Sequence, residues 1–418
     1  MFSIRQKLIW LPGLFLLAGN IVLDLKKYPQ VDYTVYVWLL VIGLGSVLVD
    51  AILRRAVPAA DEYLFPLAIL LADMGILMIG RLKPALLLPQ IRWLLIGLVV
   101  FIVVIRLTRN IHQLVSYQYL LGLASLLLLC STLVFGTDIG GNKNWIVFGP
   151  FQVQPSEFAK LLTILFLSAY LTDHKNVLTL PNTKVLWFHM PPLRFIAPLL
   201  VIWGMAILMF VLQHDLGSAL LFFGLAVFMT YMATGNKSYV FFALLFFSLA
   251  SVVSYHLFGH VRVRVAIWAN PWADPTGQAY QIVQSLFAFG SGGLWGSGFA
   301  HGFPGLIPEV HTDFIFSAIA EEFGFMGSFA IILLYVILLY RGFRTALLSS
   351  REMNMLIAAG LTVSFSWQVF IILAGITKLL PMTGITLPFI SYGGSSMVSS
   401  FISLGLLFAL SKKENNHA

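Results

Sequence analysis

Charged residues are scarce in this sequence. Only 10% of its 418 residues are Asp, Glu, Lys or Arg, whereas 59% are hydrophobic and the mean hydropathy is +0.91. A soluble domain has about 25% charged residues, so the composition excludes a soluble globular protein. The apolar runs are long and continuous and do not alternate as the strands of a membrane barrel do. They favour a bundle of membrane-spanning helices.

Cysteine is almost absent as well. The single residue, Cys130, excludes an intramolecular disulfide, and its apolar surroundings predict a small buried side chain. The chain also lacks a soluble domain and a low-complexity linker. Its N-terminus is basic and then apolar from Leu8, as in a signal peptide, but no clean small-x-small cleavage site follows. We therefore expect an uncleaved first helix.

The net charge of +8 and the pI near 9.5 would suggest a nucleic-acid partner in a soluble protein. Here the lysines and arginines lie mostly in short segments between apolar runs. This placement predicts contact with the headgroups of membrane lipids and no nucleic-acid partner.

Apolar runs of roughly twenty residues predict about twelve membrane-spanning helices, and thus an all-α polytopic membrane protein. The runs are residues 8–24, 33–53, 63–82, 91–107, 116–135, 157–172, 195–213, 216–234, 238–258, 314–340, 355–375 and 396–411. If the N-terminus is inside, most lysines and arginines of the connecting segments lie inside too. This bias predicts that both termini are cytoplasmic and that the long polar segment 259–315 is outside.

The segment 259–315 is rich in glycine and ionisable residues, and it is the place where we expect chemistry. Asp274 precedes Pro275, which is a common way to begin a helix, with Asp as N-cap and Pro at the first helical position. Alternatively, Asp274 is a carboxylate base beside Arg262 and Arg264, which would bind an anion. The residues alone leave both interpretations open.

Glu157 and Lys160 lie at the start of the predicted span 157–172 and share a helix face. A well-capped helix start with an ion pair explains them without a function. However, a lysine inside a span is costly and usually faces an internal cavity, which favours a functional pair.

Two further groups are ambiguous. His311 lies in the run Glu309-Val-His-Thr-Asp313, whose spacing carries no strong metal signature. Ser391 and Ser395 lie among glycines before the last span, where backbone N–H groups can hold a phosphate or where the serines only cap the helix.

Taken together, these stretches resemble the SEDS family (shape, elongation, division, sporulation), which includes RodA and FtsW. The resemblance extends over roughly residues 63–411. The matching stretches are Asn144-Trp-Ile, Gln154-Pro-Ser-Glu-x-x-Lys160, His214-Asp-Leu-Gly217, Asn270-Pro-Trp-Ala-Asp-Pro275, Gln278-Ala-Tyr-Gln-Ile-Val-Gln-Ser285, Gly290-Ser-Gly-Gly293, Pro308-Glu-Val-His-Thr-Asp-Phe-Ile-Phe316 with Glu321-Glu322, and Leu387-Pro-Phe-Ile-Ser-Tyr-Gly-Gly-Ser395. Two features depart from the family pattern: residues 1–60 add two spans before a ten-helix core at 61–418, and His214 replaces a proline.

The resemblance implies a bacterial peptidoglycan glycosyltransferase in the cytoplasmic membrane, which joins lipid II to the nascent glycan strand on the outer face. It implies Asp274 as the catalytic residue. The residues expected to bind substrate are Glu157, Lys160, Arg262, Arg264, Gln284, His311, Ser391 and Ser395. A class B penicillin-binding protein, which is a transpeptidase, is the implied partner.

The competing functions are a lipid II flippase, which also predicts Lys and Glu inside the membrane, and a scaffold for a cell-wall synthase, which predicts that Asp274 is dispensable. No dedicated metal site is visible in the sequence. A divalent cation such as Mg²⁺ or Mn²⁺ bridging the pyrophosphate is plausible chemistry, and no other cofactor is expected.

Overall fold

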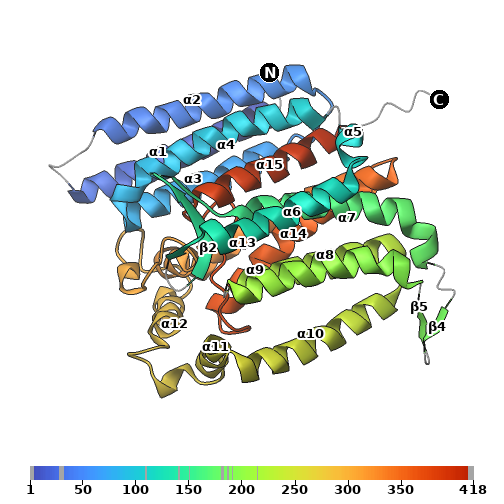
Figure 1. Ribbon diagram of the computed structural model, residues 1–418. Helices are drawn as coiled ribbons and strands as arrows, with labels where there is room; N and C mark the ends of the chain where they lie inside the picture. Colours follow the sequence, from blue (N-terminus) through green and yellow to red (C-terminus); the bar gives the residue numbers. More distant parts are fainter. Residues whose placement is uncertain are drawn as a thin grey trace. The chain divides into compact units, whose positions relative to one another are not determined.

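The computed structural model describes residues 4–27, 33–108, 111–139, 142–149, 151–179, 183–185, 188–190, 192–213 and 215–412. His214, one of the two departures from the family pattern, lies outside these residues. Each of the twelve predicted spans coincides with a helix in the structure (Figure 1).

The helices are α1 (Ile4–Lys27), α2 (Tyr33–Ala56), α3 (Leu64–Leu82), α4 (Leu87–Leu107), α5 (Ile111–Val115), α6 (Gln118–Phe135), α7 (Pro155–Thr179), α8 (Leu193–Leu212), α9 (Leu216–Thr234), α10 (Lys237–Leu257), α11 (Gly259–Ala269), α12 (Tyr280–Gly292), α13 (Ile315–Leu347), α14 (Glu352–Ile376) and α15 (Gly394–Leu410). Short 3-10 turns are η1 (Pro84–Leu86), η3 (Pro271–Ala273) and η4 (Pro304–Leu306). The strands are β1 (Thr137–Ile139), β2 (Asn142–Phe148), β3 (Phe151–Val153), β4 (Thr183–Val185) and β5 (Phe188–Met190).

Within the described residues, nine helices are long and apolar enough to cross a membrane. They include α1 to α4, α6, α9, α10, α13 and α14, whereas α7, α8 and the 17-residue α15 fall outside this group. The predicted class, an all-α polytopic membrane protein, is confirmed. The count of twelve spans remains a prediction. The antiparallel strands β1–β3 and the β4–β5 hairpin lie in connections and were not predicted.

The chain forms two compact units. The first consists of residues 1–108, 267–344 and 368–418, and the second of residues 109–266 and 345–367. Phe101 of α4 occupies the core of the first unit. Its ring stacks on Phe65 of α3 at 5.2 Å between centroids, and Phe401 and Phe408 of α15 make T-shaped contacts with it at 6.2 and 5.8 Å. Because these rings are buried, they join α3, α4 and α15 by apolar packing.

In the second unit, α6 lies beside α7 (Figure 1). The Ser125 hydroxyl of α6 donates to the Ala159 carbonyl of α7 at 3.0 Å and pairs with the Thr163 hydroxyl at 2.8 Å. Such hydrogen bonds satisfy buried polar groups where no water competes. Cys130 of α6 is only partly buried, although the sequence predicted a buried side chain.

Two expectations about the segments between residues 259 and 340 are corrected. The segment 259–315 is not a continuous loop, because α11, η3, α12 and η4 occupy much of it. The predicted continuous span 314–340 is also interrupted, since Gly324 inside α13 has the non-helical angles φ 67° and ψ −165°. A side chain is rarely tolerated at such a φ, so glycine permits the break.

Two adjacent carboxylates beside this break hold the segment that follows α12. Glu322 accepts hydrogen bonds from Arg81 Nε and from the Ala300 N–H, both at 3.1 Å. Glu321 accepts from the Phe303 N–H at 2.7 Å, and Arg81 also donates to the Gly302 carbonyl at 3.1 Å. The Glu322 side chain is fully buried, so its charge depends on these partners.

We expect Arg81→Met to lower the free energy of unfolding by about 3 kcal/mol, because it leaves a buried carboxylate without its cation. The matched control is Lys175→Met, which removes the cation from the partly exposed Lys175–Glu352 pair and costs less than about 1 kcal/mol. Thermal unfolding of the purified proteins in detergent measures the difference. Equal shifts for the two variants would show that Arg81 is no more important than a surface lysine.

Candidate functional site

Asp274 lies in an exposed turn between η3 and α12. Its carboxylate accepts the Gln278 N–H at 2.9 Å, and its carbonyl accepts the Ala279 N–H at 3.2 Å. The capping pair is instead Asn270 with Pro271, since Asn270 accepts the Trp272 N–H at the start of η3. The alternative that Asp274 begins a helix at Pro275 is therefore wrong. Its carboxylate closes a turn and remains exposed to solvent.

Gly277 makes room for this carboxylate. A Cβ at Gly277 would lie 2.3 and 2.5 Å from the two carboxylate oxygens of Asp274. No side chain fits at position 277 while Asp274 keeps this orientation. Sequence reasoning did not single out Gly277; the signal was a glycine within the polar turn that follows Asp274.

The predicted substrate residue Gln284 lies on α12 and is half-buried. Its neighbour Ser285 is buried and fixes the helix, because its hydroxyl pairs with Ser317 of α13 at 2.7 Å and donates to the Ile376 carbonyl at 3.0 Å. Gln281 of the same helix donates to the Pro308 carbonyl at 3.2 Å. Gln281 and Ser285 are four residues apart and share one face, so the helix that follows Asp274 is anchored along that face.

His311 connects the segment 259–315 to the residues before α15. Its carbonyl accepts the Tyr392 N–H at 2.9 Å, and its ring lies 3.6 Å from the Glu309 carboxylate. Ser391 donates to the Thr312 carbonyl. Glu309 has a φ of 52°, which is uncommon for a residue with a side chain and stores backbone strain. His311 and Ser391, predicted separately, therefore meet in one cluster.

Ser391 already uses its hydroxyl within the protein. Besides donating to Thr312, it accepts the Leu387 N–H at 2.9 Å. Ser395 lies in the first turn of α15 and is buried. The substrate-binding roles of both serines remain predictions, and the contacts of Ser391 favour its structural alternative.

Burial lowers the pKa of His311 from its usual 6.5, the nearby Lys83 lowers it further, and Glu309 opposes the shift. The neutral ring is therefore the form that the folded protein favours. When a folded-state pKa is depressed, the stabilisation is present above the unfolded-state pKa and is lost as pH falls below it.

We expect wild-type protein to lose more thermal stability than His311→Gln between about pH 7.5 and about pH 5.5, because only the wild type resists taking up this proton. Thermal unfolding of both proteins across this range measures the effect. Parallel profiles would mean that the folded protein does not disfavour a charged His311.

The second unit holds the predicted ion pair. Lys160 Nζ lies 2.9 Å from Glu157 Oε2 on the first turns of α7, and both side chains are at least nine-tenths buried. Pro155 begins the helix, as predicted. In a buried pair of this kind, the carboxylate balances the positive charge of the lysine inside the protein.

Arg262 and Arg264 both lie on α11, where Arg262 is exposed and Arg264 half-buried. Residues two apart point about 200° from each other around a helix. They are therefore separate candidates for an anion and not a pair on one face.

An unpredicted polar pair lies nearby in the same unit. Asn144 of β2 donates to Asp215 at 2.8 Å, while Asp215 caps α9 by accepting the Ser218 N–H at 2.9 Å. Asp215 therefore both caps α9 and holds Asn144. The contact with Asn144 joins two stretches of the family resemblance that lie 71 residues apart in sequence.

The donors for a protein-held divalent cation are not assembled in the part of the chain that the structure covers. No three His, Cys, Asp or Glu side chains cluster there. The described residues do not fit a dedicated metal site, and no step of the reaction below depends on one.

The fold and these side chains define a polytopic membrane protein with an exposed carboxylate in an extramembrane turn and a buried lysine–glutamate pair. The chain belongs to the FtsW/RodA/SpoVE family of cell cycle proteins, whose model matches residues 66–416.

Two relatives show how far the similarity extends. The peptidoglycan glycosyltransferase RodA of Mycobacterium tuberculosis is 38% identical over 372 residues, which cover 86% of this chain and 79% of that protein. Stage V sporulation protein E of Bacillus subtilis is 36% identical over 71% of this chain and 79% of its own length.

Solved structures agree with this assignment. A chain of a peptidoglycan synthase complex that coordinates polymerization and crosslinking is 31% identical, with a TM-score of 0.68 over 84% of this chain and 98% of its own. Rod shape determining protein RodA of Thermus thermophilus is 29% identical, with a TM-score of 0.60 over 85% and 99% of the two chains.

Proposed function

We propose that this protein is a peptidoglycan glycosyltransferase that polymerises lipid II at the outer face of the bacterial cytoplasmic membrane. The similarity to RodA over 86% of the chain is the observation that carries the proposal. Residues 61–418 form the glycosyltransferase core, and residues 1–60 add a helix pair to it.

Asp274 acts as the general base. The 4-hydroxyl of lipid II attacks the anomeric carbon of the glycan strand, its proton passes to the Asp274 carboxylate, and undecaprenyl pyrophosphate leaves. Two features support this role. The carboxylate is exposed to solvent, and it is oriented by the hydrogen bond from the Gln278 N–H and by the room that the missing side chain of Gly277 leaves for it. A positioned base of this kind contributes typically 10²- to 10⁴-fold to the rate.

The departing pyrophosphate requires positive charge. Lys160 is the candidate within the membrane, and Arg262 and Arg264 are candidates on α11. Glu157 orients Lys160 through their 2.9 Å contact. Gln284 and His311 contribute to the outer binding surface. A divalent cation, if present, would reach the site with the pyrophosphate, since the described protein donors do not hold one.

We expect Asp274→Asn to slow glycan-strand formation by about 10²- to 10⁴-fold while the protein stays folded. Asparagine can still accept the Gln278 N–H, so the turn persists and only the base is lost. The measurement is polymerisation of lipid II by the purified variant, with thermal stability recorded alongside. More than about half the wild-type rate would end the catalytic assignment.

Two variants accompany this assay. Gly277→Ala keeps the carboxylate but displaces it, so it should slow the reaction with little loss of stability. Lys160→Met keeps the length of the side chain and removes its charge, and an unchanged rate would reduce Lys160 to a structural role. If the protein is only a scaffold, Asp274→Asn, Gly277→Ala and Lys160→Met all leave its function unchanged. A flippase would move lipid II across vesicles and form no strands.

A single-span class B transpeptidase is the proposed partner, in keeping with the similarity of this chain to one chain of a peptidoglycan synthase complex. Both termini are proposed to be cytoplasmic.

We expect a thiol reagent that does not cross membranes to label Thr276→Cys, in a Cys130→Ala background, in intact cells. Thr276 is exposed, so the reagent can reach it if the segment is outside. Labelling only after the membrane is disrupted would reverse the proposed orientation.

A further inference from the structure

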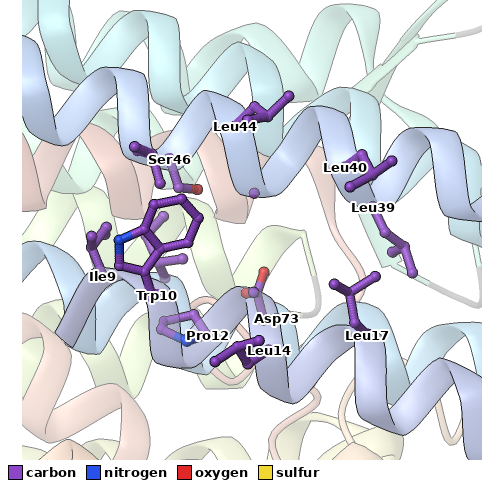
Figure 2. A pocket seen from close by; sticks show the side chains of 14 residues that line it. Ile9, Trp10, Pro12, Leu14, Leu17, Leu39, Leu40, Leu44, Ser46 and Asp73 are labelled. Carbon is purple, nitrogen blue, oxygen red and sulfur yellow. The ribbon is translucent and has the colours of Figure 1, made fainter. Parts of the chain in front are cut away.

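A pocket of about 130 Å³ lies between α1, α2 and α3 within the first unit (Figure 2). Its walls are mainly leucines, together with Trp10 of α1 and Ser46 of α2. Asp73 of α3 directs its carboxyl group into the space between α1 and α2 (Figure 2). None of these residues belongs to the site described above.

Asp73 is the unusual member of this lining. It is 1% exposed, and neither carboxylate oxygen has a hydrogen-bond partner among the described residues. Ser46 Oγ is likewise buried without a partner in the described part of the chain. Because an α-helix rises about 1.5 Å per residue, Asp73 lies about 13 Å along α3 from its first residue, near the middle of the helix. An unsatisfied carboxyl group at that depth is costly and usually marks a binding site.

The remaining walls define what can satisfy Asp73. A carboxylate and a hydroxyl accept hydrogen bonds, and the face of a tryptophan attracts a cation. Trp10 is 52% exposed at the edge of the pocket, and Leu14 and Leu44 beside it are also exposed. A group that donates several hydrogen bonds, carries a positive charge and is attached to an apolar chain complements all of these walls.

Two glycines keep the pocket open. Gly13 and Gly43 line it, and a Cβ built at either position meets no atom of the described structure within 4 Å. A cavity of about 150 Å³ holds one benzene-sized molecule. The pocket therefore admits an ammonium group and the first methylenes of its chain, and excludes a whole lipid.

We propose that this pocket binds an amphiphilic primary amine from the membrane, with its ammonium group on Asp73 and Ser46 and its alkyl chain between the leucines of α1 and α2. The ligand enters from the hydrocarbon region past Trp10. The site is separate from the glycosyltransferase site and does not depend on the activity proposed above.

The probe is octylamine, added to purified full-length protein in nanodiscs of phosphatidylglycerol. Octanol and octanoate, which have the same chain, are the matched controls. We expect octylamine alone to raise the thermal unfolding temperature. A hydrophobic carbodiimide then locates the ligand: it adds to the Asp73 carboxyl as an O-acylisourea, the amine nitrogen displaces the urea, and an amide forms that peptide mass spectrometry detects.

Two variants make the test specific. Asp73→Asn keeps the size of the side chain and should weaken octylamine binding by about tenfold or more, since a charge-assisted hydrogen bond is lost. Gly43→Phe fills the pocket without a backbone clash, keeps Asp73, and should abolish both the thermal shift and the amide. Unchanged octylamine binding in either folded variant would overturn the proposal.

The control ligands supply the other decisive outcomes. Equal stabilisation by octylamine and octanol would show an apolar pocket without amine recognition. Carbodiimide also reacts with Asp73 in the absence of an amine, and octylamine should diminish that reaction. If octylamine does not diminish it, the carboxyl group is protonated and the pocket is empty. Nanodiscs of phosphatidylethanolamine distinguish two sources of the amine: blocked octylamine binding there would assign the ammonium group to the headgroup of a bilayer lipid, whereas unchanged binding would assign it to a single-chain amphiphile.

Discussion

The first unit depends on two buried carboxylates, those of Glu321 and Glu322, which accept hydrogen bonds from backbone N–H groups outside the helices and strands. The segment 293–303 lies outside the helices and strands, so its N–H groups need partners elsewhere, and an unpaired buried N–H group costs about 1–3 kcal/mol. Glu321 and Glu322 accept two of them, and Arg81 neutralises the resulting charge. Gly324, where α13 breaks, and Gly296 allow the segment 293–303 to approach α13 closely, since a Cβ at Gly296 would lie 2.2 Å from the Glu322 carbonyl. This arrangement fixes the route of the chain between α12 and α13.

Local signals explain most of what the sequence predicted. Apolar runs identify each span because burial in lipid requires them over the whole length of a helix. The N-cap at Asp215 is a local feature of the same kind, because capping involves only residues three apart. The clustering of His311 with Ser391 was not predictable, because it depends on hydrogen bonds between residues 79 apart in sequence.

Ambiguous signals explain the errors. Asn270-Pro271 and Asp274-Pro275 carry the same capping signature, and only the first is used. Gly324 resembles any glycine inside an apolar run, so its positive φ has no signature. Asp73 lies within the predicted span 63–82, and the hydropathy pattern does not reveal it, because one charge among many apolar residues hardly changes a hydropathy average. Its isolation becomes visible only when the neighbouring helices are in place.

Asp73 also bears on the residues that precede the family match. The match begins at residue 66, so Asp73 belongs to it, whereas the α1 and α2 walls of its pocket do not. Of these two helices, α1 packs closely on α3: a Cβ at Gly19 would lie 2.6 Å from the Leu77 side chain. Without them the Asp73 carboxyl would face lipid, where no group accepts or donates a hydrogen bond. The N-terminal pair therefore completes the surroundings of a core residue, and any ligand of Asp73 is selected by helices that the matched core lacks.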